Sequence, residues 1–301
     1  MKRVLIVGCG DIARRAMPEL LKRGFRVYAL VRRAEACAAL RALGVTPLLA
    51  DLDDRRSLAR VAGVAQCILH FAPPGADGVG DPRTRRLLAA LGCASSLPQR
   101  VIYISTTGVY GDRAGRWVDE TTPCRADSAR ARRRVEAEHL LRDFGRRTRT
   151  GVSILRVPGI YALDRAPLAR IARGDPLLEA SGDVYTNHIH ADDLARIAVL
   201  ALFRGRPGRV YNAVDDSDMQ MGAYYDLVAD LAGLPRAPRR PAHEVQQQVS
   251  PMAWSFMRES RRVRNRRLHE ELRYRFIHPT VREGLAGLAG GREADAAYNH
   301  S

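Results

Sequence analysis

A glycine-rich turn between an apolar run and a helical pattern constrains the fold of this chain more than any other feature. Residues 4–7 form a continuous apolar run, Val-Leu-Ile-Val, which is too short for a helix and typical of a buried strand. The sequence Gly-Cys-Gly-Asp-Ile-Ala follows at residues 8–13, and residues 12–23 then carry apolar side chains at helical spacing and end before Gly24. The sequence therefore predicts a strand that turns directly into a helix.

The same alternation of strand and helix continues along the chain. Further strands are expected at residues 26–31, 45–50, 66–71, 100–105 and 151–156, with a late return to the sheet at residues 210–214. This order predicts an α/β fold built on a doubly wound parallel sheet of the Rossmann type. We expect residues 1–160 to form its core. Residues 161–301 are expected to be mixed, with about 185–215 returning to the sheet and the rest forming a small C-terminal substrate lobe.

The residues of the glycine turn suit a dinucleotide. Gly8 permits a tight turn and Gly10 permits close approach of a pyrophosphate. Asp11, Ile12 and Ala13 begin the helix, whose N-terminus attracts anions. A turn that merely connects strand and helix is the alternative, but the position between the two elements favours cofactor binding.

Two arginines follow the second expected strand, where a site of this kind distinguishes NAD from NADP. An acidic residue there binds the ribose 2′-hydroxyl of NAD, whereas an arginine can pair with the 2′-phosphate of NADP. Arg32 and Arg33 occupy the position, and no Asp or Glu interrupts the strand end. The sequence favours NADP and leaves NAD open, because surface arginines are common in this chain.

The positive charge of the chain does not indicate a nucleic-acid partner. The 301 residues carry a formal net charge of +16, yet the arginines are scattered and form no recognised binding module. The densest stretch, residues 258–267, is expected to form an amphipathic helix with the residues that follow. No apolar run reaches the roughly 18 residues of a membrane helix. We therefore expect a cytoplasmic protein that contacts neither nucleic acid nor membrane.

Several segments, in order, resemble one known superfamily. The segments beyond the glycine turn are residues 50–52, 70–74, 103–112, 155–161 and 187–194. Together they are similar to the short-chain dehydrogenases/reductases, specifically to the extended and atypical members described as NAD-dependent epimerase/dehydratase-like proteins. The resemblance runs along nearly the whole chain.

The resemblance implies further cofactor contacts. Asp51 and Leu52 correspond to the segment at the adenine, and the segment along the cofactor ribose follows the fourth strand. The residues assigned to the cofactor on this basis are Asp51, Leu52, Phe71, Ala72, Pro73 and Pro158.

The resemblance also implies substrate contacts. Thr106, four residues before Tyr110, takes the place of the catalytic serine or threonine, whose hydroxyl can hydrogen-bond the reacting oxygen. Thr107, Arg156 and Tyr161 are assigned to the substrate cleft.

One part of the family's active site is missing. Its redox chemistry uses a tyrosine and a lysine one helical turn apart, with the tyrosine as acid and base. Those positions fall on Arg130 and Arg134. Arginine stays protonated, so Arg130 cannot transfer a proton, although both arginines can hold an anionic substrate or a diphosphate.

Three other groups of polar residues have structural explanations. His188 and His190 would share one face of a strand, but no third ligand is spaced for zinc and the cysteines form no CxxC pair, so no metal site is expected. Asp192 and Asp193 open a helical pattern, and an N-cap role is expected for at least one of them. Glu120 is expected to be a solvated loop carboxylate.

Two functions from different classes follow. The first is an NADP(H)-dependent epimerase, dehydratase or reductase acting on a nucleotide-sugar or similar polar small molecule, with Thr106 at the reacting oxygen. The second is a non-catalytic NADP(H)-binding sensor or regulatory protein, which the missing tyrosine and lysine favour. The retained Thr106 and the C-terminal lobe favour the enzyme. The oligomeric state stays open, with a homodimer as one option.

Overall fold

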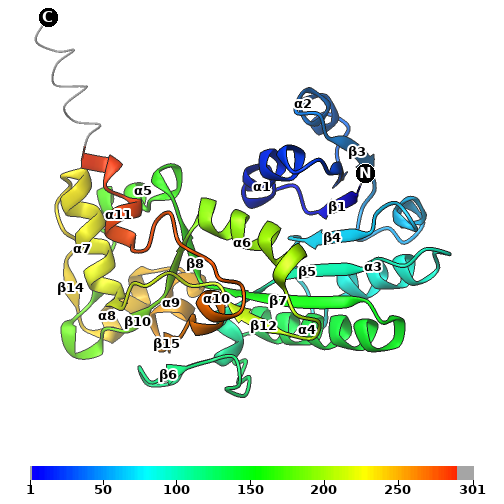
Figure 1. The fold of residues 1–301 in the computed structure, drawn as a ribbon. Helices are drawn as coiled ribbons and strands as arrows, with labels where there is room; N and C mark the ends of the chain where they lie inside the picture. The colour runs from blue at the N-terminus through cyan, green and yellow to red at the C-terminus, as the bar shows by residue number, and fades with distance from the viewer. Residues whose placement is uncertain (1, 290–301) are drawn as a thin grey trace, which may run out of the picture.

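The computed structural model describes residues 2–289, and a seven-stranded parallel sheet forms its centre (Figure 1). The strand order is β12-β7-β5-β4-β1-β2-β3. This order confirms the predicted doubly wound sheet and places its switch point between β1 and β4. The strands are β1 (Arg3–Val7), β2 (Arg26–Val31), β3 (Thr46–Leu49), β4 (Cys67–His70), β5 (Arg100–Thr106), β7 (Gly151–Val157) and β12 (Val210–Asn212).

Helices cover both faces of the sheet. Along β1, Val4 and Ile6 pack on the side of α1 (Asp11–Lys22), α2 (Ala36–Ala42) and α6 (Ala191–Arg204), as Figure 1 shows. Leu5 and Val7 face α3 (Pro82–Gly92) and α4 (Ala129–Thr148) on the other side. A strand buried on both faces reads as a continuous apolar run, which is why residues 4–7 lack alternation. Each such buried side chain contributes about 1.5–3 kcal/mol.

A smaller lobe beside the carboxyl edge of the sheet is built from later segments (Figure 1). Its cluster of buried side chains joins α5, α7 and α11. The division of the chain at residue 160 stays a prediction. The helices are α5 (Leu168–Ala172), α7 (Met221–Ala232), α8 (Ala242–Gln248), α9 (Pro251–Met257), α10 (Arg266–Glu270) and α11 (Val281–Gly284). The short strands are β6 (Trp117–Val118), β8 (Gly159–Tyr161), β9 (Leu177–Leu178), β10 (Tyr185–Thr186), β11 (His188–His190), β13 (Met219–Gln220), β14 (Arg239–Arg240) and β15 (Arg262–Val263).

The arginine-rich stretch at residues 258–267 differs from the predicted helix. Its middle forms β15, which pairs with β6, and α10 begins only at Arg266. Arg261 and Val263 are buried while Arg264 is exposed. This alternation has the period of a strand, and the many arginines concealed it because arginine suits a helix equally well.

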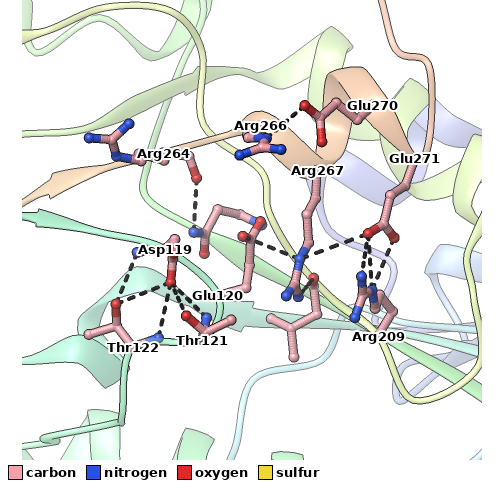
Figure 2. Close-up of polar contacts among 12 residues, drawn as sticks. Asp119, Glu120, Thr121, Thr122, Arg209, Arg264, Arg266, Arg267, Glu270 and Glu271 are labelled. Carbon is pink, nitrogen blue, oxygen red and sulfur yellow. Dashed lines mark hydrogen bonds and ion pairs between the residues drawn. The ribbon is translucent and has the colours of Figure 1, made fainter.

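Side chains from the loop after β6 and from α10 hydrogen-bond the backbone of β12, the strand at the edge of the sheet (Figure 2). Glu120 accepts the backbone N–H of Asn212 in β12 at 2.9 Å, and Arg267 donates to the carbonyl of Val210 at 3.1 Å. Arg267 also lies 3.6 Å from Glu120, whose side chain is 4% exposed. Burial raises the pKa of Glu120, opposed by its bond from Asn212. The expectation of a solvated Glu120 is wrong, because this carboxylate satisfies an edge strand.

Within residues 2–289, no helix is both long and apolar enough to cross a membrane.

Candidate functional site

The turn after β1 is open toward a ligand. Gly8 has a φ of 97°, and a Cβ there would lie 2.5 Å from the backbone nitrogen of Ala72, so glycine is required. Gly10 caps α1 without a side-chain hydrogen bond, and no described atom lies within 4 Å of the place its Cβ would take. The first N–H groups of α1 are therefore available to an anion.

A cavity of about 440 Å³ opens at this turn, a size typical of small-molecule sites. Its walls follow the carboxyl ends of β1, β2, β3 and β4. All of the predicted cofactor residues line it except Pro158, which lies in a neighbouring cleft. Three arginines that the sequence analysis did not assign, Arg14, Arg83 and Arg165, complete the wall.

Arg32 and Arg33 lie exposed at the rim of this cavity, directly after β2. Asp53 is nearby, but its carboxylate is held by Arg83 at 2.5 Å, and this bond is the main reason that the pKa of Asp53 is lowered. Among the described residues, neither the Arg32 nor the Arg33 guanidinium has a hydrogen-bond or ion-pair partner. Both side chains are free to meet an anionic ligand.

Asp11 uses its carboxylate within the protein. It accepts from Arg15 at 2.9 Å and from Arg165 at 3.1 Å, and Arg15 also pairs with Asp164 and Asp192. This network joins α1 and α6 to the loop before α5. The cofactor contact predicted for Asp11 is therefore left to its backbone N–H.

A second cavity, also about 440 Å³, lies at the carboxyl ends of β5 and β7; it is called the cleft below. Five of the predicted residues line it, namely Thr106, Thr107, Arg130, Pro158 and Tyr161. Sequence reasoning missed other lining residues, because they come from the lobe and from β11, far along the chain. Those with polar or charged side chains are Arg170, Tyr185, Thr186, Asn187, His188, Tyr224, Tyr225, Glu259 and Arg261.

Thr106 ends β5 opposite Val157 of β7. Its Oγ1 accepts the N–H of Gly108 at 3.1 Å and caps the short 3₁₀ turn Thr107–Tyr110. The hydroxyl hydrogen is not used in that bond, so the group can still donate to an oxygen in the cleft. This geometry is compatible with the role that the resemblance implies.

Arg134 does not line the cleft, contrary to its assignment to substrate. Its Nη1 donates to the hydroxyl of Tyr103 at 2.9 Å and to the carbonyl of Ile104 at 2.7 Å. The guanidinium thus fixes α4 against β5. Arg130, one turn earlier on α4, does face the cleft, with its guanidinium 4.2 Å from the ring centre of Phe256.

Arg156 is buried beneath the cleft, so its assignment to substrate binding is corrected. It donates to Glu138 through Nε at 3.1 Å and Nη2 at 2.8 Å. The two side chains are 4% and 1% exposed. Burial would raise the pKa of Glu138, but Arg156, Ser105 and Arg142 together lower it. The pair joins β7 to α4, and Arg156 lines neither of the two cavities.

Buried polar groups form the wall of the cleft next to the lobe. His188 stacks on Tyr224 with ring centres 4.2 Å apart, and burial lowers the pKa of His188 to about 3. Its ring is therefore neutral at physiological pH. Tyr161 lies beside it, with its hydroxyl buried near Asp215, and burial raises the pKa of Asp215 to about 7.

Asp215 gives the protein a pH-dependent stability. Because its pKa is raised from 3.8 to about 7, the protonated form is favoured in the folded state. Its contribution is complete below about pH 4 and is lost as the pH rises through about 7. We expect Asp215→Asn to remove on the order of 2 kcal/mol of this pH dependence.

Urea unfolding of both proteins at pH 5 and pH 8 measures the effect. Asp218→Asn, at a half-exposed carboxylate three residues further along the chain, is the matched control and should keep the pH dependence of the unaltered protein. An identical change in the free energy of unfolding between pH 5 and pH 8 in all three proteins would contradict the expectation.

The N-terminus of α6 differs from the predicted arrangement. The ring of His190, not an aspartate, caps the helix by accepting the N–H of Asp192 at 3.2 Å. Asp193 is fully buried and accepts from Tyr274 and from the N–H groups of residues 277 and 278. The structure also brings His278 and Asp192 near His190, with ligand atoms within 4.8 Å, a group that sequence spacing did not indicate. We assign no ion, because the His190 and His278 rings lie only 3.8 Å apart at an angle of 39°.

A family model described as "NAD dependent epimerase/dehydratase family" matches residues 4–213. The chain belongs to this family. The matched range contains the glycine turn, Thr106 and β12, so it spans the whole central sheet. As a member of this epimerase/dehydratase family of oxidoreductases, the chain has in its first cavity a wall suited to a nicotinamide dinucleotide.

Sequence relatives in the family are distant. Protein YeeZ of Escherichia coli strain K12 is 28% identical over 245 residues, which cover 78% of this chain and 85% of that protein. A 4-hydroxy-2-methyl-3-oxo-4-farnesyl-3,4-dihydroquinoline-1-oxide ketoreductase of Stigmatella aurantiaca is 27% identical over 252 residues, or 78% of this chain and 74% of the ketoreductase. The solved structure of a functionally unknown conserved protein from Silicibacter pomeroyi is 32% identical, has a TM-score of 0.81, and is matched over 97% of this chain and 100% of its own.

Proposed function

We propose that the chain is an NADP(H)-dependent oxidoreductase that acts on a nucleotide-sugar or a similar polar small molecule. One observation carries the proposal. The two cavities lie side by side along the carboxyl edge of the sheet, one lined by the glycine turn and Arg32, the other by Thr106. In open α/β sheets, ligands bind at this edge, near the point where the strand order reverses.

The first cavity suits NADP. Gly8 and Gly10 would let a pyrophosphate approach the backbone at the start of α1, and Arg32 and Arg33 would meet the 2′-phosphate. When bound, the nicotinamide supplies or accepts a hydride. Thr106 is placed to hold the oxygen of the reacting group, and Arg130 to hold a negative charge beside it. Since Arg130 keeps its proton, water or another side chain must provide the proton.

A non-catalytic NADP(H) sensor remains the second candidate. It is favoured by the sequence prediction that Arg130 and Arg134 take the positions of the family's tyrosine and lysine. NADPH oxidation measured against a panel of nucleotide-sugars and carbonyl compounds distinguishes the two, because a sensor binds NADPH and turns over none of them.

Cofactor preference tests the proposal directly. We expect NADPH to bind at least tenfold more tightly than NADH, a difference of about 1.4 kcal/mol, because two unpartnered guanidinium groups lie at the 2′ position. Fluorescence titration with each nucleotide measures the ratio. Replacing both Arg32 and Arg33 with alanine should bring the ratio close to one, while NADH affinity stays nearly unchanged.

Arg41→Ala is the matched control, since Arg41 is an exposed arginine on the adjoining helix α2 that does not line the cavity. This variant should keep the preference for NADPH. Equal affinity of the unaltered protein for the two nucleotides would refute the assignment of NADP.

A further inference from the structure

Along the direction of strand β5, Arg130 of α4 lies level with Thr106. Helix α4 connects two parallel strands, β5 and β7, so it runs antiparallel to them. Arg134 bonds the carbonyl of Ile104, which fixes the helix against the strand at that level. Four helical residues span about 6 Å and two strand residues span about 6.6 Å. Arg130 therefore reaches the level of Thr106, at the end of the cleft where the reacting group would lie.

The guanidinium of Arg130 contacts an aromatic ring and has no polar partner. Its central carbon lies 4.2 Å from the ring centre of Phe256, contributed by α9. Among residues 2–289, no side chain or carbonyl forms a hydrogen bond or ion pair with this guanidinium. Burial is the main cause that lowers its pKa. A half-buried arginine with unsatisfied N–H groups is suited to a planar two-oxygen acceptor.

Arg261 also lines the cleft and is a second arginine with an unsatisfied donor. It is 9% exposed, and its buried Nε has no partner, while Nη1 donates to the carbonyl of Gly111 and to Glu259 at 2.8 Å. The negative charge of Glu259 also acts on Arg130 and opposes the lowering of its pKa. Arg170, the remaining cationic residue of the lining, is occupied by the hydroxyl of Tyr225 at 2.9 Å.

The charges of this corner select the kind of anion. Among the groups that line this corner, Arg130 and Arg261 share the single carboxylate of Glu259, so one lining guanidinium is left without a carboxylate. Arg133 and Arg134 do not line the cleft and add positive charge from behind it. One guanidinium fork pairs directly with the two oxygens of one carboxylate, which favours a carboxylate as the group bound here. The height of Arg130 places this carboxylate next to the group held by Thr106.

We infer that the cleft contains a carboxylate subsite formed by Arg130 and Arg261, and that the substrate is a small acid whose carboxylate adjoins its carbonyl or hydroxyl group. This inference rests on the proposed function and narrows its substrate to an oxo acid or hydroxy acid. In the reductive direction, a bound reduced nicotinamide would supply the hydride for the new C–H bond at the carbonyl carbon. Water would supply the proton to the oxygen, and the products would be the hydroxy acid, NADP⁺ and hydroxide.

Binding of oxamate, a non-reducible analogue of a 2-oxo acid, tests the subsite. Calorimetric titration of the protein saturated with NADPH should show saturable one-to-one binding. Arg130→Gln should weaken it at least tenfold, and this variant should fold, because Arg130 makes no hydrogen bond or ion pair with residues 2–289. Glu259→Gln should tighten it severalfold by removing the internal competitor. Arg132→Gln, at an exposed arginine on the same helix, should leave it unchanged.

Several results would overturn the subsite. These are no saturable oxamate binding to the NADPH complex, equal affinity in Arg130→Gln, or UDP binding that depends on Arg130 while oxamate does not bind. The titration is repeated without nucleotide to separate the two proposals. Oxamate binding that depends on Arg130, in a protein that fails to bind NADPH, would support the subsite and refute the proposed function.

Discussion

Replacing Glu138 with leucine is expected to lower the free energy of unfolding by about 3–5 kcal/mol. The substitution leaves the Arg156 guanidinium buried without its ion-pair partner, since both side chains are almost fully enclosed. The orphaned Nη1 of Arg156 shows that the site has no spare acceptor to replace the carboxylate. Urea unfolding followed by circular dichroism measures the change, provided that the dependence on urea concentration is the same in both proteins.

Two further variants test whether the loss of stability comes from the unpaired, buried charge of Arg156. Combining Glu138→Leu with Arg156→Met should recover most of the loss, because an apolar pair of similar volume avoids the burial of charge. Asp143→Ala removes an ion pair with Arg146 on the exposed side of the same helix and should cost less than about 1 kcal/mol. A loss in Glu138→Leu no larger than that in Asp143→Ala would show that the buried pair contributes little.

The sequence predicts the fold well, and nearly all of the residues it assigns to the cofactor line one cavity, because both depend on short segments. Gly8 and Gly10 adjoin an apolar strand, and Arg32 follows the next strand, so neighbouring residues carry the signal. Parallel strands then bring their carboxyl ends to one edge, which assembles the cavity without any information about distant side chains. For the same reason, the class of the sheet could be confirmed from strand order alone.

The cleft could be predicted only in part because its walls come from distant segments. Arg156 and Glu138 belong to different elements, and nothing local shows that they pair. Glu120 was expected to be solvated and Asp193 was a candidate N-cap, yet each carboxylate is buried because it satisfies backbone N–H groups of another segment. Arg261 stood in a stretch read as a helix, where its position in the cleft could not be seen.

The buried ion pair between Glu138 and Arg156 also helps to hold Arg130 in position. Arg156 lies near the end of β7, two residues before Pro158, and Glu138 lies two turns after Arg130 on α4. Their bond fixes the helix that carries Arg130 against the strand that leads into the cleft. Arg134 adds a second attachment to β5. Rigid support of this kind is what a binding group needs in order to keep its position.

Replacing Thr106 with alanine is expected to lower turnover of an identified substrate about a hundredfold or more, as removal of one preorganised hydrogen-bond donor typically does. The affinity for NADPH should change less than twofold, because Thr106 lines the cleft and not the cofactor cavity. The methyl group of alanine can neither donate to a substrate oxygen nor accept the N–H of Gly108. Steady-state kinetics at saturating substrate and NADPH titration measure the two effects separately.

Thr106→Ser separates chemistry from structure. Serine keeps both the donor and the cap on the 3₁₀ turn, which are the two interactions lost in alanine. We expect Thr106→Ser to retain most of the activity, and thermal unfolding should show that loss of the cap alone costs Thr106→Ala about 1 kcal/mol. Full activity in Thr106→Ala would remove this hydroxyl from the mechanism.

If NADPH binds tightly, no compound is turned over, and Thr106→Ala changes neither binding nor any response to ligand, the protein is a sensor. The cleft then serves recognition without hydride transfer.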